Sequence, residues 1–239
     1  MTPTARARDA EARRARAERI LDAAGELLLR WGYKRFTMDD VAEHAGIGKG
    51  TIYLHWTTRE DLFMAVIGRE FGKAVEELVA AMREDPRAAL LHRLLPRWFR
   101  ALRGRPLVCA AVGSDPDVLG KLKEGVGRIV NSRMRCGIDD YLRLHAEYGL
   151  LRQDFSVEEL SCGIRSVMRG FFMADAMTPE DHAIPLERKA ELLEAVFASA
   201  FETSQEPPEE ALQAISARAI DIFTDVAEYF QAQQRQAYE

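Results

Sequence analysis

The chain has 239 residues and a net charge of −5, with 47% apolar and 30% charged residues. This balance indicates a folded globular protein of one or two domains and argues against one that coats nucleic acid without selectivity. No run of about 18 apolar residues predicts a membrane span, and the basic, Ala-rich start lacks the apolar core of a signal peptide. Three isolated cysteines favour neither a disulfide framework nor a zinc site, so we expect a cytoplasmic protein without a metal or other cofactor.

Positive charge gathers at the start of this acidic chain. The first twenty residues hold six arginines against three acidic residues. This segment includes Arg13, Arg14 and Arg16, which either form a basic arm that contacts DNA or belong to a solvated terminus. The sequence leaves both interpretations open.

The first half of the chain predicts a series of helices. Apolar residues recur at helical spacing from about residue 16 to Gly32, which ends the run. Thr37 with Asp40 then has the pattern of a capping box that opens a short helix ending at Gly46. A second short helix is expected over about 49–56.

Longer helices are predicted after this pair. Thr58 with Asp61, and Ser156 with Glu159, have the capping-box pattern. Pro96 should kink or break the helix that follows Pro86. The Asp115-Pro116 dipeptide marks another break, Gly149 marks a helix end, and two further helices begin near Pro185 and Pro207. With no convincing strand run, we expect an all-α protein of nine or ten helices.

The segment 46–51, with the sequence GIGKGT, raises the question of what phosphate it binds. A nucleotide-binding P-loop requires glycine where Glu43 stands and Ser or Thr where Gly50 stands, so that interpretation fails. A helix-turn-helix fits the spacing. It needs a small residue, a turn glycine and an apolar anchor, and these are Ala42, Gly46 and Ile52.

The stretch GIGKGTIYLHW at 46–56, followed by Thr58, Arg59, Glu60 and Leu62, resembles the recognition segment of TetR-family transcriptional repressors. The resemblance extends over about residues 12–66. Trp56 and Arg59 replace the usual phenylalanine and lysine. Gly48 stands where serine is common, so a helix cap and a possible phosphate contact are missing.

The resemblance implies a set of DNA contacts. Residues in the second short helix would face bases or phosphates in the major groove, and those around it would hold the DNA backbone. The DNA-binding residues implied in this way are Thr37, Lys49, Gly50, Thr51, Tyr53, His55 and Arg59. Trp56 is expected in the core, and the arginines of the arm could reach the adjacent minor groove.

The fold implied is a three-helix DNA-binding domain over 1–60 and a larger helical ligand-binding and dimerisation domain over 61–239. A homodimer would read a palindromic operator. We expect its interface to use 156–177 with either 186–204 or 208–232, because both of these are amphipathic.

A small, largely apolar effector is implied for the second domain. Apolar groups and two polar ones lie on helices that could converge there. The candidate ligand-binding residues are Trp98, Phe99, Met134, Tyr141, His145, Arg165, Met168 and Phe172. Effector binding would favour a dimer with its recognition helices wrongly spaced for the operator.

Two other classes of protein were weighed. No H-E-x-x-H, G-x-S-x-G or Cys/His cluster supports an enzyme. In a helical regulatory protein that acts through protein contacts, Lys49, Tyr53 and Arg59 would have no function to perform. Activation of transcription on the same scaffold remains an alternative to repression.

Overall fold

The computed structural model describes residues 5–113, 123–177 and 184–236, with the side chains of 7–110, 135–174 and 184–232. Within these ranges the fold is all-α, as expected, and strand-like pairing is limited to one bridge between Leu151 and Glu202. The helices are α1 (Ala5–Trp31), α2 (Met38–His44), α3 (Lys49–Tyr53), α4 (Arg59–Glu84), the 3-10 helix η1 (Pro86–Ala89), α5 (Leu91–Arg103), α6 (Pro106–Gly113), α8 (Lys123–Glu147), α9 (Val157–Met177), α10 (Leu186–Ala200) and α11 (Glu209–Gln236).

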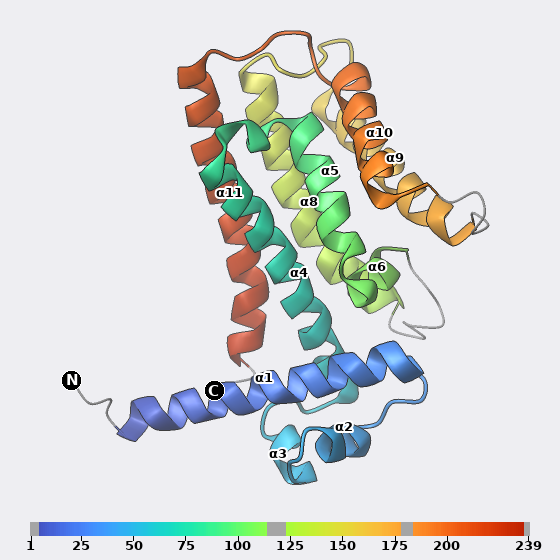
Figure 1. Ribbon diagram of the computed structural model, residues 1–239. Coiled ribbons are helices and arrows are strands. Elements are labelled where there is room, and N and C mark those ends of the chain that lie inside the picture. Colours follow the sequence, from blue (N-terminus) through green and yellow to red (C-terminus); the bar gives the residue numbers. More distant parts are fainter. Residues whose placement is uncertain (1–4, 114–122, 178–183, 237–239) are drawn as a thin grey trace.

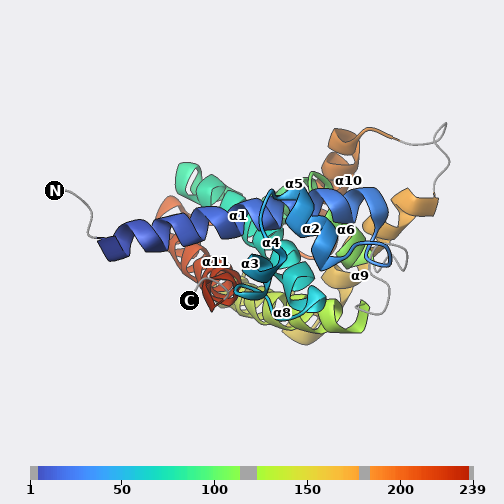
Figure 2. The same cartoon turned by 90° about the horizontal axis from the view of Figure 1, so that it is seen from below.

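Helices α1, α2 and α3 form one end of the molecule (Figure 1). Helix α1 lies across the ends of α4 and α11, and α2 and α3 lie on its far side, as the view from below in Figure 2 also shows. The remaining helices form the body. Because α4 leads from the small end into the body, its first and last turns have different neighbours.

The three expected capping boxes are present. In each, the side-chain hydroxyl accepts a hydrogen bond from a backbone N–H three residues on, and the carboxylate there accepts one in return, so two N–H groups are satisfied. The pairs are Thr37 with Asp40, Thr58 with Asp61, and Ser156 with Glu159.

The glycines predicted to end helices do so in the left-handed backbone region. Gly32, Gly46 and Gly149 have φ angles of 70°, 65° and 69°. Side chains with a Cβ rarely adopt this conformation, so glycine is the residue that ends these helices at low cost.

Pro96 does not break its helix, so the expectation of a break there was wrong. Helix α5 runs from Leu91 to Arg103 with Pro96 inside it. The proline removes one backbone donor, but the same helix buries Leu95, Trp98 and Phe99. Burial of this face outweighs the lost hydrogen bond.

Two helix bounds also differ from expectation. Helix α1 begins at Ala5, well before residue 16, so the basic segment is helical. Helix α3 ends at Tyr53 instead of near Trp56. The expected break at Asp115-Pro116 lies outside the described residues.

Helix α4 supplies the largest share of the core, because it is apolar along most of its length. It buries Leu62 and Phe63 at its start and Leu78 and Met82 near its end. Among the described residues, none of the helices combines the length and apolar character needed to cross a membrane.

Helix α11 packs on α4 at Gly68 and Gly72, where the added side chain of an alanine would be in ordinary contact. A Cβ added at Gly68 or Gly72 would lie 3.7 Å from Phe230 of α11. One turn before Phe230, Val226 meets α8: a Cβ at Gly137 would lie 2.8 Å from it, which is closer than real Cβ atoms approach. The apolar face of α11 is therefore covered within its own subunit.

Candidate DNA-binding surface

A small core holds α2 and α3 at a fixed angle. Val41, Ala42 and Ile52 are buried beneath the turn, and Ile47 packs against them. The turn itself is closed by the Ile47 N–H, which donates to the carbonyl of Ala42 at 3.0 Å, and by the positive φ of Gly46. A five-residue helix is unstable alone, so α3 depends on this packing. The predicted core of the helix-turn-helix is confirmed.

The outer face of α3 presents polar groups with few internal contacts. Lys49 and Gly50 are exposed, Thr51 is half-buried, and 46% of Tyr53 is exposed. A side chain added at Gly50 would meet no atom within 4 Å. This face is therefore open to a macromolecular ligand.

Leu54 is a residue that the sequence analysis missed. It caps the C-terminal end of α3 and is 79% exposed, the largest fraction among the exposed large apolar side chains of the described residues. Its position between Tyr53 and His55 was the only available signal. An apolar group there can contact the methyl group of thymine in a major groove.

Lys49 forms an ion pair with an acidic neighbour. Its Nζ lies 2.6 Å from a carboxylate oxygen of Asp39 in α2. The hydrogen bond to Asp39 raises the pKa of Lys49, so the ammonium is fully charged at neutral pH. Both side chains are exposed, so the pair is weak and can exchange for a phosphate at little cost.

The hydroxyl of Thr37 already serves the capping box of α2. It donates to the carboxylate of Asp40 at 2.6 Å and accepts from the Asp40 N–H at 3.3 Å. A phosphate at Thr37 would therefore compete with a carboxylate in the same position. The predicted phosphate contact stays a prediction.

Arg59 packs inward, although it was predicted to hold a phosphate. Its guanidinium donates to the carbonyls of Tyr33 at 3.4 Å and Phe36 at 3.2 Å. It also lies 4.1 Å from the centre of the Tyr33 ring, a cation–π distance. These contacts fasten the start of α4 to the turn between α1 and α2.

Tyr33 completes this attachment. Its hydroxyl donates to the carboxylate of Glu60, and its ring packs edge-on against Phe63 at 5.2 Å. Burial and the hydrogen bond to Glu60 raise the pKa of Tyr33 to about 12, while the same bond lowers the pKa of Glu60. In this partly buried polar cluster, Tyr33 is therefore protonated and Glu60 ionised at neutral pH.

His55 and Trp56 lie beneath the end of α3. Trp56 is buried, as expected, and the His55 ring is half-buried at 5.5 Å from the indole. His44 lies outside this group and pairs with Glu26 of α1 at 2.7 Å. The predicted DNA contact of His55 would use the exposed edge of its ring.

The basic segment forms the outer half of α1, which projects past the body (Figure 1). Arg13 and Arg14 are exposed there, and Arg16 is half-buried. A helix with side chains is about 10 Å wide and the minor groove about 6 Å. The first turns of α1 would have to unwind before these arginines entered a minor groove.

The predicted ligand-binding residues whose side chains the structure describes lie in more than one place. Phe99 meets Phe172 at 5.0 Å between α5 and α9, with Met168 buried on the same helix. Trp98 faces the opposite way and packs on Phe71 of α4 at 5.2 Å. The side chain of Met134 lies outside the described residues.

Three other predicted ligand residues have internal partners. Tyr141 is fully buried and donates to the carbonyl of Ala89 at 2.6 Å, and its ring packs at a tilt against that of His145, with centroids 4.2 Å apart. Burial lowers the pKa of His145, which is therefore neutral. Arg165 is partly exposed and pairs with Asp139 of α8 at 3.6 Å. These groups stabilise the body without forming a pocket together.

The body also carries an open groove between α4, α5 and α10 with a volume of about 1130 Å³. Its lining is mostly charged, unlike an apolar effector site. The charged residues in it are Glu70, Lys73, Glu77, Arg93, Arg97, Arg100, Arg105, Glu187 and Glu194.

The fold and this surface define a helix-turn-helix DNA-binding protein. Residues 20–66 match the family described as bacterial regulatory proteins of the tetR family. The repressor KstR of Mycolicibacterium smegmatis is 28% identical over 59% of this chain and 72% of its own length. The activator FasR of the same organism is 32% identical over 33% of this chain and 34% of its own length.

Solved structures share the fold. A transcriptional regulator FadR from Bacillus subtilis, in complex with stearoyl-CoA, superposes with a TM-score of 0.61 at 18% identity, over 76% of this chain and 97% of its own. The family match over residues 20–66 and the relatives support a TetR-family transcriptional regulator.

The position of Arg59 predicts a loss of stability when it is removed. Arg59→Ala should destabilise the fold by about 1–2 kcal/mol, because two hydrogen bonds and a cation–π contact are lost. Lys49→Ala, which removes an exposed cation from the same end of the molecule, should melt like the wild type. Thermal unfolding followed by circular dichroism compares them, and equal melting temperatures would show that the Arg59 contacts contribute nothing.

Proposed function

We propose that this chain is a homodimeric repressor that binds a palindromic operator and leaves it when a small, largely apolar effector binds. The observation that carries the proposal is the outer face of α3, where Lys49, Gly50, Thr51 and Tyr53 stand over a buried core. The face lies at the end of the molecule away from the body (Figure 1).

The proposed contacts follow from position. Lys49 and Thr51, at the start of α3, face base edges or phosphates, and Gly50 lets the backbone approach the DNA. Tyr53 and His55 hold the backbone, and Leu54 meets a thymine methyl group. Thr37 and Arg59 complete the phosphate contacts, each after giving up internal hydrogen bonds.

The proposed domain division is 1–60 for DNA binding and 61–239 for the effector and the dimer. Helix α4 begins at Arg59 and runs to Glu84, so it crosses this boundary without interruption. A rigid helix across the boundary provides a way for a change in the body to move the recognition helices.

Two exposed helix faces support a dimer formed by α9 and α10. Helix α9 exposes small side chains at intervals of four residues, and α10 exposes Leu192 with small neighbours. These residues are Cys162, Ser166, Gly170 and Ala174 on α9, and Leu192, Ala195 and Ser199 on α10. Small residues let helices approach closely, and an apolar face of this kind is suited to burial in a partner.

Packing favours α10 over α11 as the second interface helix. The apolar residues of α11, among them Phe223 and Phe230, are buried against α4 and α8 of the same subunit. Phe201, directly after α10, lies against Gly163 of α9, where a Cβ would be 2.9 Å from its ring. The region 186–204 is therefore the proposed partner of 156–177.

The effector is proposed to bind among the apolar residues between α5, α8 and α9. Phe99, Met168 and Phe172 would form one wall. Met134, Trp98, Tyr141, His145 and Arg165 are the further candidates, and the last four would reach the effector only after giving up the internal contacts described above. The stearoyl-CoA bound by a protein of the same fold makes that compound a suitable probe. To release the protein from DNA, the effector must bind more tightly to the conformation that does not fit the operator than to the one that does.

Activation is the second candidate, because one relative is named an activator. The same DNA contacts serve both outcomes, and the position of the operator relative to the promoter distinguishes them. A regulator that acts only through protein contacts would not need the exposed cation and phenol on α3.

Selection of genomic DNA fragments by the purified protein tests the proposed DNA contacts. The wild type should enrich one palindromic site, and Lys49→Ala and Tyr53→Ala should each weaken binding to it by at least about tenfold. Lys49→Ala should also lower the slope of log affinity against log salt by about one per subunit. The control is Arg143→Ala, which removes an exposed, paired cation from α8. Equal affinity in all four proteins would refute the site.

The dimer interface is tested by filling the small-residue face. A side chain at Gly170 meets no atom within 4 Å of its Cβ in the subunit, so Gly170→Phe should keep its helical content but become monomeric. Light scattering after size exclusion measures this, with Arg143→Phe on α8 as the matched control. A Gly170→Phe protein that is still dimeric would contradict the interface.

A further inference from the structure

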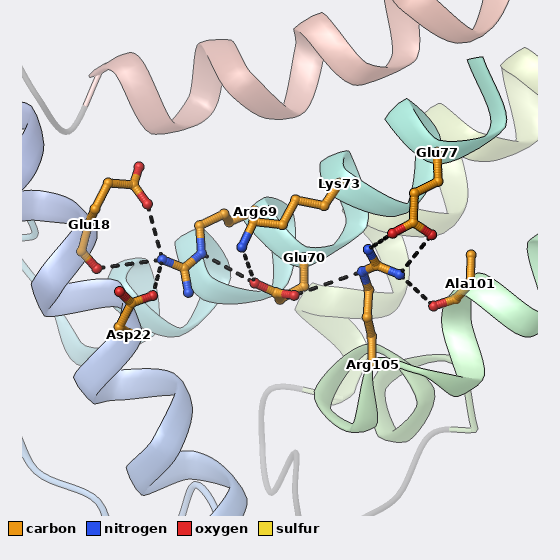
Figure 3. A network of polar contacts seen from close by, with 8 residues as sticks. All are labelled: Glu18, Asp22, Arg69, Glu70, Lys73, Glu77, Ala101 and Arg105. Atoms are coloured by element: carbon orange, nitrogen blue, oxygen red, sulfur yellow. Dashed lines mark hydrogen bonds and ion pairs between the residues drawn. The ribbon is translucent and has the colours of Figure 1, made fainter. Parts of the chain in front are cut away.

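Arg69 is a nearly buried cation on a helix that is otherwise apolar on that side. Its side chain is 9% exposed, and it follows Val66 and Ile67, which are fully buried. Its Nη1 lies 2.8 Å from a carboxylate oxygen of Asp22 and 3.1 Å from one of Glu18, both in α1. The arginine therefore joins α4 directly to the first helix of the DNA-binding end (Figure 3).

The contacts continue to the other side of α4. The Arg69 Nε lies 3.3 Å from Glu70, an ion-pair distance without hydrogen-bond geometry. Glu70 also pairs with Lys73 at 3.0 Å and, in the same non-hydrogen-bonded way, with Arg105 at 3.8 Å. Arg105 stands between α5 and α6, where it pairs with Glu77 at 2.5 Å and donates to the carbonyl of Ala101 at 2.7 Å. Figure 3 shows these residues as one continuous series from α1 to α5.

The directional nature of these contacts distinguishes them from the apolar packing around them. Apolar burial has no preferred direction, so α1 and α4 could rotate slightly against each other while remaining packed. A guanidinium is a planar fork of N–H donors, and here its Nη1 lies at both α1 carboxylates and donates to that of Glu18. Replacing a buried ion pair by apolar groups is often neutral for stability, so stability alone does not account for an arginine here.

We propose that Arg69, with Glu18, Asp22 and Glu70, is a positioning group that fixes the angle between the DNA-binding end and the body, and thereby the separation of half-sites that the dimer accepts. This inference rests on the proposed function. It adds a role to residues that touch no DNA: they determine the spacing of the operator, while α3 determines its sequence.

Glu70 and Arg105 also line the charged groove between α4, α5 and α10. A change in the packing of α5 would therefore reach α1 through two ion pairs and the backbone of α4. This arrangement gives the body a short physical connection to the recognition helices.

The test compares operator libraries in which two fixed half-sites are separated by spacers of different length. The wild type should select one spacing. Arg69→Met, which keeps the side-chain volume but loses the fork, should select the same half-sites over a wider range of spacings. Arg69→Lys should be intermediate, because one ammonium can hold α1 but cannot also bridge to Glu70. The control is Arg218→Met, which breaks an ion pair of 2.6 Å between α11 and α8.

A second variant tests the same contacts without replacing the buried arginine, so that the inference can be judged even if Arg69→Met does not fold. Glu18 and Asp22 have side chains that are 40% and 63% exposed, so Glu18→Ala with Asp22→Ala removes both carboxylates with little loss of packing. It should widen the accepted spacing as Arg69→Met does. Selection of the single wild-type spacing by folded Arg69→Met, or by this double variant, would overturn the inference.

A measurement without DNA separates failure of this inference from failure of the proposed function. Spin labels are placed at Glu43→Cys and Arg143→Cys of one subunit, in protein whose three native cysteines are replaced by alanine and which is diluted with unlabelled chain. The label-to-label distance distribution should be narrow in the wild type and broader with Arg69→Met. Equal widths would overturn the inference, whereas absence of any operator for the wild type would count against the proposed function alone.

Discussion

The rest of the structure depends on the burial of α4, because this one helix connects both ends of a single apolar core. Its first turns cover the core of the helix-turn-helix through Leu62 and Phe63, and its later turns pack on α11 through Gly68 and Gly72. Neither α3 nor α2 is long enough to be stable alone. The orientation of the recognition surface is therefore set by α4, whose other end lies inside the body.

Polar groups then set the geometry that apolar burial leaves undefined. The Tyr33, Arg59 and Glu60 cluster fastens the start of α4, and Arg69 fastens α1 two to three turns further on. Several residues of the predicted DNA surface also serve the fold, as the hydroxyl of Thr37 does in its capping box. Measured effects on DNA binding have to be read beside measured stability for such residues.

Local features of the sequence were sufficient to predict the helices and the motif. The capping pairs, Gly32, Gly46 and the core residue Ile52 depend on neighbours within a few positions, and all were confirmed.

Features that depend on distant parts of the chain were not predictable. Pro96 stays helical because α5 buries its apolar face, and Arg59 turns inward to carbonyls more than twenty residues away. The positions of the candidate ligand residues also depend on distant contacts, since periodicity does not specify which helices meet.

The central claim is that two copies of α3, held by α4 and by the dimer, read one face of a DNA duplex. Hydroxyl-radical footprinting of the full chain on its selected operator tests this claim most directly. A dimer of this kind should protect two patches on one face of the duplex, with centres about 34 Å apart and related by the twofold axis of the site. A single protected patch, or continuous protection without sequence preference, would contradict it.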